Sequence, residues 1–435
     1  MTYLQRFDNP KDEELQIFCT RNLLDETSVQ ASVEEILATV KREGDSALLR
    51  YSKEFDGVTL SSLTVSEEEI YAAVATVNVE LKEAITKAKT NIHTFHEAQR
   101  GEGEFVEVES GIALQRKIVP IRRVGLYIPG GTAPLFSTVL MLAIPATIAG
   151  CSEIVLCTPP NSEGAIHPAI LYAAKLCGVT EIYKVGGAQA IGALAYGTET
   201  VKKVDKIFGP GNRFVTEAKS QVARSICAID MPAGPSEVMV IASDSSSPRF
   251  VASDLLSQAE HGPDSQAMLV LISSHPDQWI ERLEGQLEEQ LSTLARGEYA
   301  KLSLKESRIA VVQTLEEATR IANTYAAEHL IINTGCDEDD DQILDVIDSA
   351  GSIFVGPYTP ESVGDYACGT NHTLPTGGWA RSMSGVSTDS FIKKITIQTL
   401  TKGGLKQLGP SVVTMAHNEE LEAHARAVTI RLEDL

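Results

Sequence analysis

Short apolar runs alternate with longer amphipathic segments from about residue 120 onward. The runs have the length of strands, and the segments between them repeat their apolar residues at helical spacing. The runs read VGLYIP, EIVLCTP, EIYKVGG, EVMVIA, QAMLVLIS, RIAVVQT, HLIINT and GSIFVG. Strands that alternate with helices in this way are typical of parallel sheets with helices on their faces. The pattern therefore predicts an α/β fold.

Two blocks of this region follow the same plan of strand, helix and strand. The first helix is expected to open with Pro134 and close by Gly150, and the second to open with Pro248 and close by Gly262. Proline suits the first helical turn, and glycine suits the residue just past the last turn. Residue identity between the blocks is low, and Pro145 is expected to kink the first helix. The shared plan nonetheless indicates an internal duplication.

The pattern divides the chain into four parts. Residues 1–105 read as mainly helical, and as packing rather than chemistry, because their apolar residues recur at helical spacing. Two α/β domains are expected over 106–235 and 236–380. The pattern over residues 381–435 predicts a short strand and one or two helices. Its apolar segments ITIQTL and AVTI need another protein surface to pack against. We therefore expect this tail to pack on a second copy of the chain.

Charge and composition narrow the class of partner. The chain of 435 residues has a net charge of -22 and no dense block of Lys and Arg, which disfavours nucleic acid and anionic membranes. Its start is charged throughout and no apolar run is long enough to span a membrane, so we expect a cytoplasmic protein that binds small molecules. The cysteines are scattered singly, as reduced thiols are, without a CxxC pair. An acidic run at 336–341 is expected to form a loop.

The stretch SQAEHGPDSQ places Gln258 and His261 at the end of the second predicted helix. With Asp254 they lie at the border of an apolar arc, so both side chains are expected to leave the helix at the edge of its buried face. Such a position beside strand ends is where an α/β sheet usually opens its ligand crevice. A hydrogen-bonded glutamine and a terminal histidine favoured by the helix dipole explain the pair at least as well.

A second polar stretch, ESVGDYACGTNHTLPTGG, follows the last predicted strand. It places Glu361, Asp365, Asn371 and His372 among glycines. Glycine lets the backbone approach a ligand closely, and loops at strand ends often carry sites. An ordinary polar loop is the alternative.

Two further stretches carry acid–base pairs. EELEAHARAV places Glu419 and Glu420 before His424 on a predicted helix, where Glu420 can merely pair with the histidine. YAAEHLIINT places Glu328 and His329 between a helix that starts with a capping box and the strand HLIINT. Adjacent residues at such a junction point in different directions, and a carboxylate beside an imidazole can supply two general bases. Two polar residues that close a helix are an equally good interpretation of that junction.

Glycine-rich turns follow several of the predicted strands. No strand is followed by GxGxxG, but IPGG at 128–131, VGGAQA at 185–190 and FGPGN at 208–212 each end a strand-like run. Backbone N–H groups in such loops can cradle phosphate, although this signal alone is weak.

These stretches, in this order and with the motifs GLYIPGGTAPLFSTVLML, VGGAQAIGALAYGTE, KIFGPGNRFVTEAK and DMPAGPSEV, closely resemble the histidinol dehydrogenase family. The resemblance runs from about residue 115 to about residue 430. It implies a zinc-dependent homodimer with two incomplete Rossmann-like domains, which agrees with the predicted duplication and the missing GxGxxG. It also implies oxidation of L-histidinol to L-histidine through histidinaldehyde, with reduction of two NAD+, in the last steps of histidine biosynthesis.

The resemblance implies roles for individual residues. Matched by position, the ligands of one zinc ion per subunit are Gln258, His261, Asp365 and His424, the last contributed by the partner subunit. The catalytic bases are Glu328 and His329. The substrate contacts are the four zinc ligands with Ser236, His329, His372 and Glu419. The positions that contact NAD+ are Tyr127, Gln189 and Asn212.

The chemistry of such a site is coherent. Two nitrogen and two oxygen donors suit zinc, and also manganese or cobalt. The metal would orient the substrate through its imidazole and amino nitrogens rather than generate hydroxide. His329 is expected to take the hydroxyl proton, and Glu328 to activate the water that adds to the aldehyde. Two other classes of protein share part of these features. A zinc hydrolase would use the same metal with water as nucleophile, and a nucleotide-binding regulator would keep the glycine loops without turnover.

Overall fold

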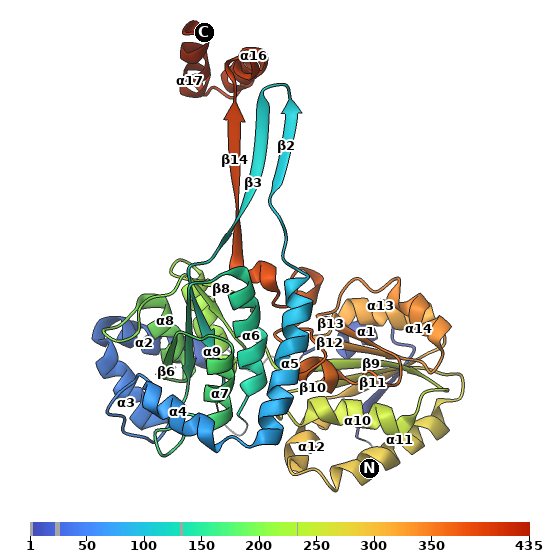
Figure 1. The fold of residues 1–435 in the computed structure, drawn as a ribbon. Coiled ribbons are helices and arrows are strands. Elements are labelled where there is room, and N and C mark those ends of the chain that lie inside the picture. The colour runs from blue at the N-terminus through green and yellow to red at the C-terminus, as the bar shows by residue number, and fades with distance from the viewer. Residues whose placement is uncertain (1–2, 22–26, 131–133, 233) are drawn as a thin grey trace.

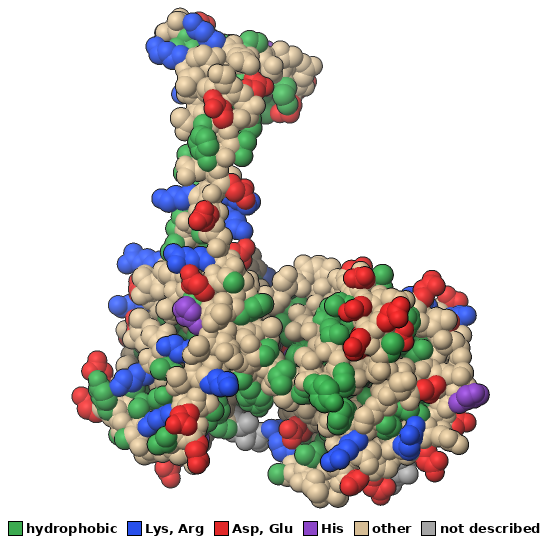
Figure 2. Space-filling view, turned by 45° about the vertical axis from the view of Figure 1, so that its right-hand side comes forward, with side chains coloured by type: hydrophobic (Ala, Val, Ile, Leu, Met, Phe, Trp, Pro, Cys, Tyr) green, Lys and Arg blue, Asp and Glu red, His purple; other side chains and the backbone are tan. Residues whose placement is uncertain are grey.

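Two α/β bodies lie side by side, and a long narrow arm stands away from them (Figure 1). This is a computed structural model, and it describes residues 3–21, 27–130, 134–232 and 234–435. Figure 2 shows the arm rising clear of the molecular surface. Among the described residues, no helix has both the length and the apolar character needed to cross a membrane.

The first body is built on a five-stranded sheet in the order β6-β5-β4-β7-β8, with every neighbouring pair parallel. Its strands are β4 (Arg123–Tyr127), β5 (Glu153–Thr158), β6 (Glu181–Lys184), β7 (Lys206–Phe208) and β8 (Ala228–Ile229). The connecting helices are α6 (Phe136–Ala149), α7 (Pro168–Leu176), α8 (Gly187–Tyr196) and α9 (Arg213–Ala223). Alternate residues of each strand enter two separate apolar cores, because successive side chains point to opposite faces.

The N-terminal helices cover both faces of this first sheet. They are α2 (Thr27–Glu43), α3 (Asp45–Phe55), α4 (Glu67–Thr76) and α5 (Val79–Glu97). Ile85 and Ile92 of α5 pack with α6 and α7, whereas Val33 and Leu37 of α2 pack with α8 and α9. The expected helical character of this region therefore holds for these segments.

The start of the chain belongs to the second body instead. Strand β1 (Gln5–Asp8) pairs in parallel with β11, and α1 (Asp12–Phe18) packs Leu15 and Phe18 into the second body's core. A strand was not expected there. The run QRFD is too short and too polar for its pattern to predict a strand. The strand forms because the edge of β11 provides backbone hydrogen-bond partners.

The second body carries a six-stranded parallel sheet in the order β1-β11-β10-β9-β12-β13. Its other strands are β9 (Glu237–Ser243), β10 (Gln266–Ile272), β11 (Arg308–Val312), β12 (His329–Asn333) and β13 (Ser352–Val355). Its helices are α10 (Pro248–Ala259), α11 (Pro276–Leu291), α12 (Gly297–Lys305), α13 (Leu315–Tyr325), α14 (Asp337–Leu344) and α15 (Glu361–Tyr366). Without β1, its strand order repeats that of the first sheet, and the predicted α/β class with parallel sheets is confirmed.

Several predicted boundaries shift. Helix α6 begins at Phe136 rather than Pro134 and ends against Gly150 as predicted, and this glycine has a left-handed conformation with φ 89. Pro145 lies inside α6 without ending it. Helix α10 begins at Pro248 as predicted, but it ends at Ala259, before Gly262.

The acidic run at 336–341 is helical, so its assignment to a loop is wrong. Cys336 precedes α14, and the four acidic residues 337–340 lie in the first turn, where the helix dipole favours negative charge. Asp340 is buried and accepts hydrogen bonds from the N–H and the hydroxyl of Thr334, while Ile343 enters the core.

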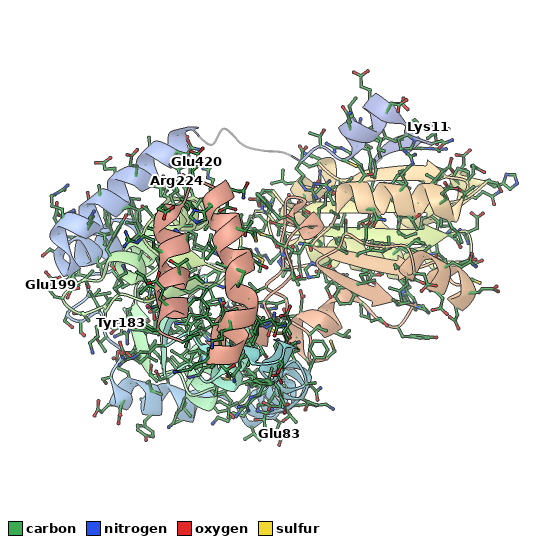
Figure 3. All side chains as sticks on the ribbon, turned by 90° about the horizontal axis from the view of Figure 1, so that it is seen from above. Lys11, Glu83, Tyr183, Glu199, Arg224 and Glu420 are labelled. Atoms are coloured by element: carbon green, nitrogen blue, oxygen red, sulfur yellow. The ribbon has the colours of Figure 1, made fainter. Side chains whose placement is uncertain are left out.

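The arm is an antiparallel sheet of three strands in the order β14-β3-β2. They are β2 (Glu104–Glu109), β3 (Ile112–Pro120) and β14 (Ile392–Leu400), the last preceded by short 3-10 helices at Trp379–Arg381 and Thr388–Phe391. Helices α16 (Lys402–Asn418) and α17 (Glu422–Glu433) pack on each other at its tip (Figure 1). Viewed along the arm, this helical pair lies above the first body (Figure 3). The exposed apolar side chains on the arm include Phe105, Val106, Ile395 and Ile397.

Candidate active site

Gln258 and His261 occupy the end of α10, as predicted. Val251, Leu255 and Ala259 of the same helix form its buried face in the second core. Gln258 lies at the edge of that face and is fully buried, and neither its amide oxygen nor its amide nitrogen has a hydrogen-bond partner. His261 follows the helix and is exposed to solvent. A buried amide without partners costs free energy, so its retention indicates that a ligand satisfies it.

Glu361 and Asp365 project from α15, a short helix where a polar loop was expected. They are four residues apart and therefore lie on the same side of the helix. Glu361 is buried, and its Oε2 has no hydrogen-bond partner. The potential ligand atoms of His261, Glu361 and Asp365 all lie within 4.8 Å of one another. This cluster of two carboxylates and one imidazole can hold a divalent metal ion.

Glu328 and His329 lie at the junction between α13 and β12, as predicted. The capping box of Thr314 and Glu317 is present at the start of α13. Both side chains at the junction are buried. The backbone N–H of Glu237 donates to Glu328 Oε2 at 3.0 Å, which fixes the carboxylate.

The imidazole of His329 lies between two carboxylates. Its Nδ1 is 3.7 Å from Glu328 Oε2, and its Nε2 is 3.3 Å from Asp365 Oδ1. The acid–base pair and the candidate metal ligands are therefore in direct contact. This is the spatial convergence that the separate stretches of sequence could not establish.

Burial and charge shift the pKa values of these groups strongly. Desolvation raises the pKa of Glu328 to about 8, against the opposing charge of His329. Desolvation by itself lowers the pKa of His329, but the charges of Glu361, Glu328 and Asp365 outweigh it and raise that pKa to about 10. Desolvation also raises the pKa of Glu361 to about 8. Perturbed groups that share one cluster are typical of an active site.

His372 joins the two bodies beside this cluster. Its Nε2 lies 3.2 Å from the hydroxyl of Thr138 on α6, and its Nδ1 lies 2.9 Å from the carbonyl oxygen of Asp365. Both ring nitrogens therefore have partners within the chain. Ser236 is half-buried directly before β9, and its carbonyl oxygen accepts the N–H of Gln266. The substrate contacts assigned to these two residues stay predictions.

The cluster lies at the amino ends of the strands of the second sheet. His329 starts β12, Glu237 starts β9, and α10 ends just before β10 begins. The Gln258 pair therefore lies beside strand ends, as predicted, but these are the amino ends, whereas ligand crevices of such sheets usually open at the carboxyl ends. The contact between His372 and Thr138, in the first turn after β4, brings the carboxyl ends of the first sheet to this edge.

Glu419 and His424 lie far from the cluster within one chain. Both are exposed at the tip of the arm, in and after the turn between α16 and α17 (Figure 1). Glu420 has a φ of 60 in that turn, so Glu419 and His424 do not share one helix as predicted. Within one chain, His424 therefore does not join the cluster.

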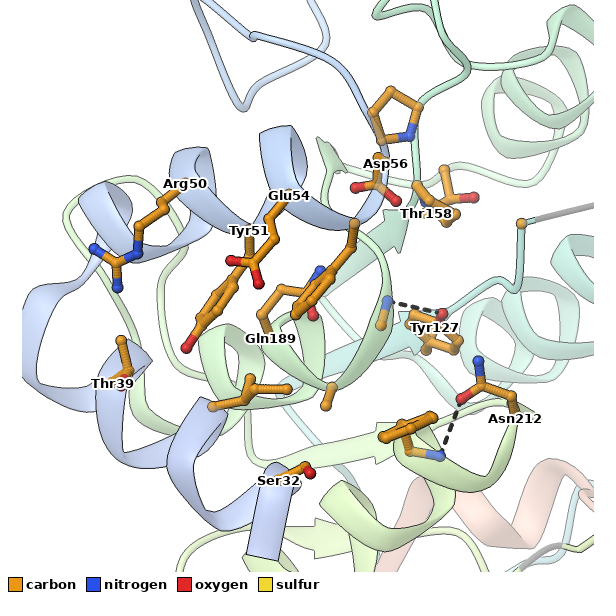
Figure 4. A pocket seen from close by; sticks show the side chains of 18 of the residues that line it. Ser32, Thr39, Arg50, Tyr51, Glu54, Asp56, Tyr127, Thr158, Gln189 and Asn212 are labelled. Carbon is orange, nitrogen blue, oxygen red and sulfur yellow. Dashed lines mark hydrogen bonds between the residues drawn. The ribbon is translucent and has the colours of Figure 1, made fainter. Parts of the chain in front are cut away.

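Tyr127, Gln189 and Asn212 come together at the carboxyl ends of the first sheet. They line a cavity of about 1050 Å³ (Figure 4). The N–H of Gly187 donates to the Tyr127 hydroxyl at 3.1 Å. Asn212 Oδ1 accepts the N–H groups of Phe214 and Val215, so this residue also caps α9.

The glycine loops pack against one another at this edge. A side chain on Gly130 or Gly186 would collide with the ring of Pro159, and one on Gly209 would collide with the carbonyl oxygen of Tyr127. Glycine is thus required there for the loops to converge. Gly131 of the IPGG turn lies outside the described residues.

The N-terminal helices contribute to the same cavity. Ser32 and Thr39 of α2, and Tyr51 of α3, belong to its wall. The expectation that residues 1–105 serve packing rather than chemistry is therefore incomplete. Helical periodicity identified their buried faces but not the side chains turned toward this space.

Known proteins match this architecture along nearly the whole chain. A family model described as histidinol dehydrogenase matches residues 19–432. Histidinol dehydrogenase of Bacteroides thetaiotaomicron is 54% identical over 430 residues, which cover 98% of this chain and 98% of that protein. The corresponding protein of Bacteroides fragilis is 54% identical over 416 residues, covering 96% of this chain and 94% of that protein. The crystal structure of histidinol dehydrogenase from Elizabethkingia anophelis has a TM-score of 0.95 and 48% identity, covering 100% of this chain and 99% of that chain.

The two-body α/β fold, with its buried acid–base pair and these relatives, defines the chain as an oxidoreductase of the dehydrogenase class. Within that class, the chain belongs to the histidinol dehydrogenase family. The resemblance inferred from the sequence motifs is confirmed.

Proposed function

We propose that the protein is a zinc-dependent L-histidinol dehydrogenase. It oxidises L-histidinol to L-histidine through histidinaldehyde, reduces two NAD+, and serves the last steps of histidine biosynthesis in the cytoplasm. The observation that carries this proposal is the contact between His329 and Asp365 at 3.3 Å, because it joins the candidate acid–base pair to the candidate metal ligands.

The donors present suit a zinc ion. Gln258, His261 and Asp365 would hold it with His424 of the partner subunit, giving two oxygen and two nitrogen donors. The buried and unpartnered amide of Gln258 supports this set, since a ligand explains why a polar group is kept there. When bound, the metal supplies a Lewis-acid centre that orients the substrate's imidazole and amino nitrogens.

His329 is placed to take the proton of the substrate hydroxyl as hydride leaves the carbon for NAD+. An imidazole that gains a proton between Glu328 and Asp365 is stabilised by both carboxylates. The charge of Glu361, together with those of Glu328 and Asp365, raises the pKa of His329 against desolvation. Burial of the ring also keeps bulk water away from the aldehyde formed in the first oxidation.

Glu328 is placed to activate the water that adds to the aldehyde before the second oxidation. Its buried carboxylate has a pKa of about 8, so it is a stronger base than an exposed glutamate. The hydrogen bond from the N–H of Glu237 holds Oε2 in a fixed direction.

Tyr127, Gln189 and Asn212 would contact NAD+ in the cavity of the first body. They lie at the ends of β4, β6 and β7, which is where parallel sheets of this strand order bind dinucleotides. We also propose that the two predicted domains, 106–235 and 236–380, arose by duplication, because the sheets that they contribute to the two bodies share one strand order apart from β1.

The tail, 381–435, would pack on the partner subunit of a homodimer. Its exposed apolar side chains and the distance of the α16–α17 tip from its own body support this arrangement (Figure 1). Glu419 and His424 would then enter the site of the partner, as substrate contact and as zinc ligand.

One assay tests the reaction. The protein is mixed with NAD+ and L-histidinol, and NADH is followed by absorbance while L-histidine is quantified and zinc is measured. Two NADH for each L-histidine, lost on chelation and restored by zinc, is the expected result. Product released without NADH would indicate a zinc hydrolase, and nucleotide binding without turnover would indicate a regulator. Either result overturns the proposal.

A further inference from the structure

The cavity of the first body contains a carboxylate that the reaction does not use. Asp56 follows the last turn of α3 and lines this cavity (Figure 4). Its Oδ2 is buried and has no hydrogen-bond partner. Desolvation raises its pKa to about 6, so the protein loses free energy by keeping this charge here. An unpaired, partly buried carboxylate in the wall of a large cavity indicates a ligand that donates hydrogen bonds.

A second polar atom in the same wall has the same property. Thr158 is the last residue of β5, is fully buried and lines the cavity, and its hydroxyl has no hydrogen-bond partner. Both residues therefore line one space, and each has a buried oxygen atom without a hydrogen-bond partner. The charge of Asp56, after desolvation, also helps to raise the pKa of Tyr127, so the carboxylate is close to the predicted NAD contacts.

The position of Thr158 in the fold identifies the part of a nucleotide that would lie there. In the order β6-β5-β4-β7-β8, β5 is the second strand in sequence and lies beside the first. In dinucleotide-binding folds of this order, an acidic residue after the second strand accepts hydrogen bonds from the ribose of the adenosine half. Here Pro159 and Pro160 follow Thr158, and neither has a carboxylate that could accept hydrogen bonds from the ribose. Asp56 supplies a carboxylate to the same cavity from helix α3 instead.

The charges around Asp56 favour an uncharged ribose over a phosphorylated one. Two guanidinium groups belong to the described wall of the cavity, those of Arg42 and Arg50. Both are paired with Glu43, each at 2.6 Å. The remaining charged wall residues include the carboxylates of Glu35 and Glu54. A 2′-phosphate in this space would meet acidic groups and no unpaired guanidinium of the described wall.

We propose that Asp56 accepts hydrogen bonds from the hydroxyl groups of the adenosine ribose, with Thr158 beside it, and thereby makes the cavity select NAD over NADP. This rests on the proposed function, in which this cavity binds NAD. Asp56 would be a specificity-determining residue, with no part in the transfer of hydride.

The test measures dissociation constants of NADH and NADPH by fluorescence titration of the zinc-loaded protein, without substrate. The wild type is expected to bind NADH at least about tenfold more tightly than NADPH. Asp56→Asn keeps the shape and removes the charge, and it should weaken NADH binding about tenfold or more, since a hydrogen bond to a charged group is lost. NADPH binding should stay equal or improve. Glu54→Gln is the matched control, an exposed carboxylate of the same wall whose loss should change the ratio much less, because solvent screens its charge.

The urea midpoint separates recognition from a structural role. Because desolvation disfavours the charged form of Asp56, Asp56→Asn should not lower the midpoint. Thr158→Val is an independent variant that should weaken NADH binding severalfold at an unchanged midpoint. The measured quantity is the ratio of the NADPH to the NADH dissociation constant. The proposal is overturned if this ratio in Asp56→Asn stays within twofold of the wild type. It is also overturned if the ratio changes equally in Glu54→Gln. A wild type that binds neither nucleotide overturns the proposed function, and this inference with it.

Discussion

Glu361 and Asp365 lie one helical turn apart on α15, and their carboxylates approach the imidazole of His261 so that the potential ligand atoms lie within 4.8 Å of one another. Asp365 also contacts His329, whereas Glu361 Oε2 has no hydrogen-bond partner. Two carboxylates this close repel each other unless a cation lies between or beside them. The pair therefore makes the candidate metal-binding cluster more negative than the ligand set expected from the sequence.

Glu361→Gln should weaken zinc binding about 10- to 100-fold, the range found when a group that supports metal ligands is removed. The reason is the loss of one negative charge beside the cation. Competition with a chelator measures the affinity. Glu316→Gln, an exposed carboxylate on α13, is the control. If the wild type, Glu361→Gln and Glu316→Gln all bind zinc with equal affinity, Glu361 does not act on the metal.

Gln258→Met should stabilise the metal-free protein by about 1–3 kcal/mol, because it replaces a buried amide without partners by an apolar side chain of similar length. The same change should abolish the stabilisation that zinc gives to the wild type. Urea unfolding with and without zinc measures both effects. A destabilised metal-free variant would mean that the amide has a structural partner.

Mixed dimers test whether ligands come from two chains. His424→Asn and His261→Asn should each be inactive and low in zinc. Mixing the two variants should restore part of the activity, since some mixed dimers contain one site with all its wild-type ligands. Activity and zinc content are measured after subunit exchange has been verified. No recovery after verified exchange would assign each site to a single chain.

Glu328→Gln should separate the two oxidations. If Glu328 activates the water that adds to the aldehyde, the variant should oxidise L-histidinaldehyde much more slowly while its oxidation of L-histidinol is less impaired. A loss of about 10²- to 10⁴-fold in the affected step is typical for removal of a general base. Single-turnover formation of NADH from each substrate measures the two rates. Equal losses would contradict the assigned role.

The rate should rise with pH, because both proposed bases act only after losing a proton. The pKa of Glu328 is about 8, so the increase in rate that accompanies its deprotonation should occur on the alkaline side of neutral pH. Glu361 is the largest cause that raises the pKa of His329. Glu361→Gln removes that charge and should therefore move the limb that belongs to His329 to lower pH. A pH–rate profile of both proteins at saturating zinc measures the shift, and an unshifted profile would contradict it.

Local features of the fold were predictable because they depend on residues close in sequence. The capping box at Thr314 and Glu317, the start of α10 at Pro248 and the left-handed Gly150 follow from local chemistry. The strand β1 was not predictable, because its four residues pair with β11, whose position depends on the whole second body.

Some features of the candidate site were also predictable, because they depend on residues close in sequence. Helical spacing placed Gln258 and His261 near the border of one buried face, but it could not show that Gln258 has no partner. Glu361 was only one polar residue of an apparent loop until α15 folded and buried it. Asp56 gave no signal, because a polar residue at a helix end is ordinary and its cavity is formed by distant strands.

The pairing of β1 with β11 joins Gln5 to Arg308, and β14 joins Lys393 to Val119 in the arm. A ribosome adds roughly 5–20 residues per second, so the first strand leaves the tunnel on the order of 15–60 seconds before its partner exists. The hairpin of β2 and β3 waits in the same way for β14, which lies in the last tenth of the chain, with the outer edge of β3 unpaired until then. Newly made chains thus pass through a period in which strand edges that are paired in the finished fold lie open, and open edges of this kind promote aggregation.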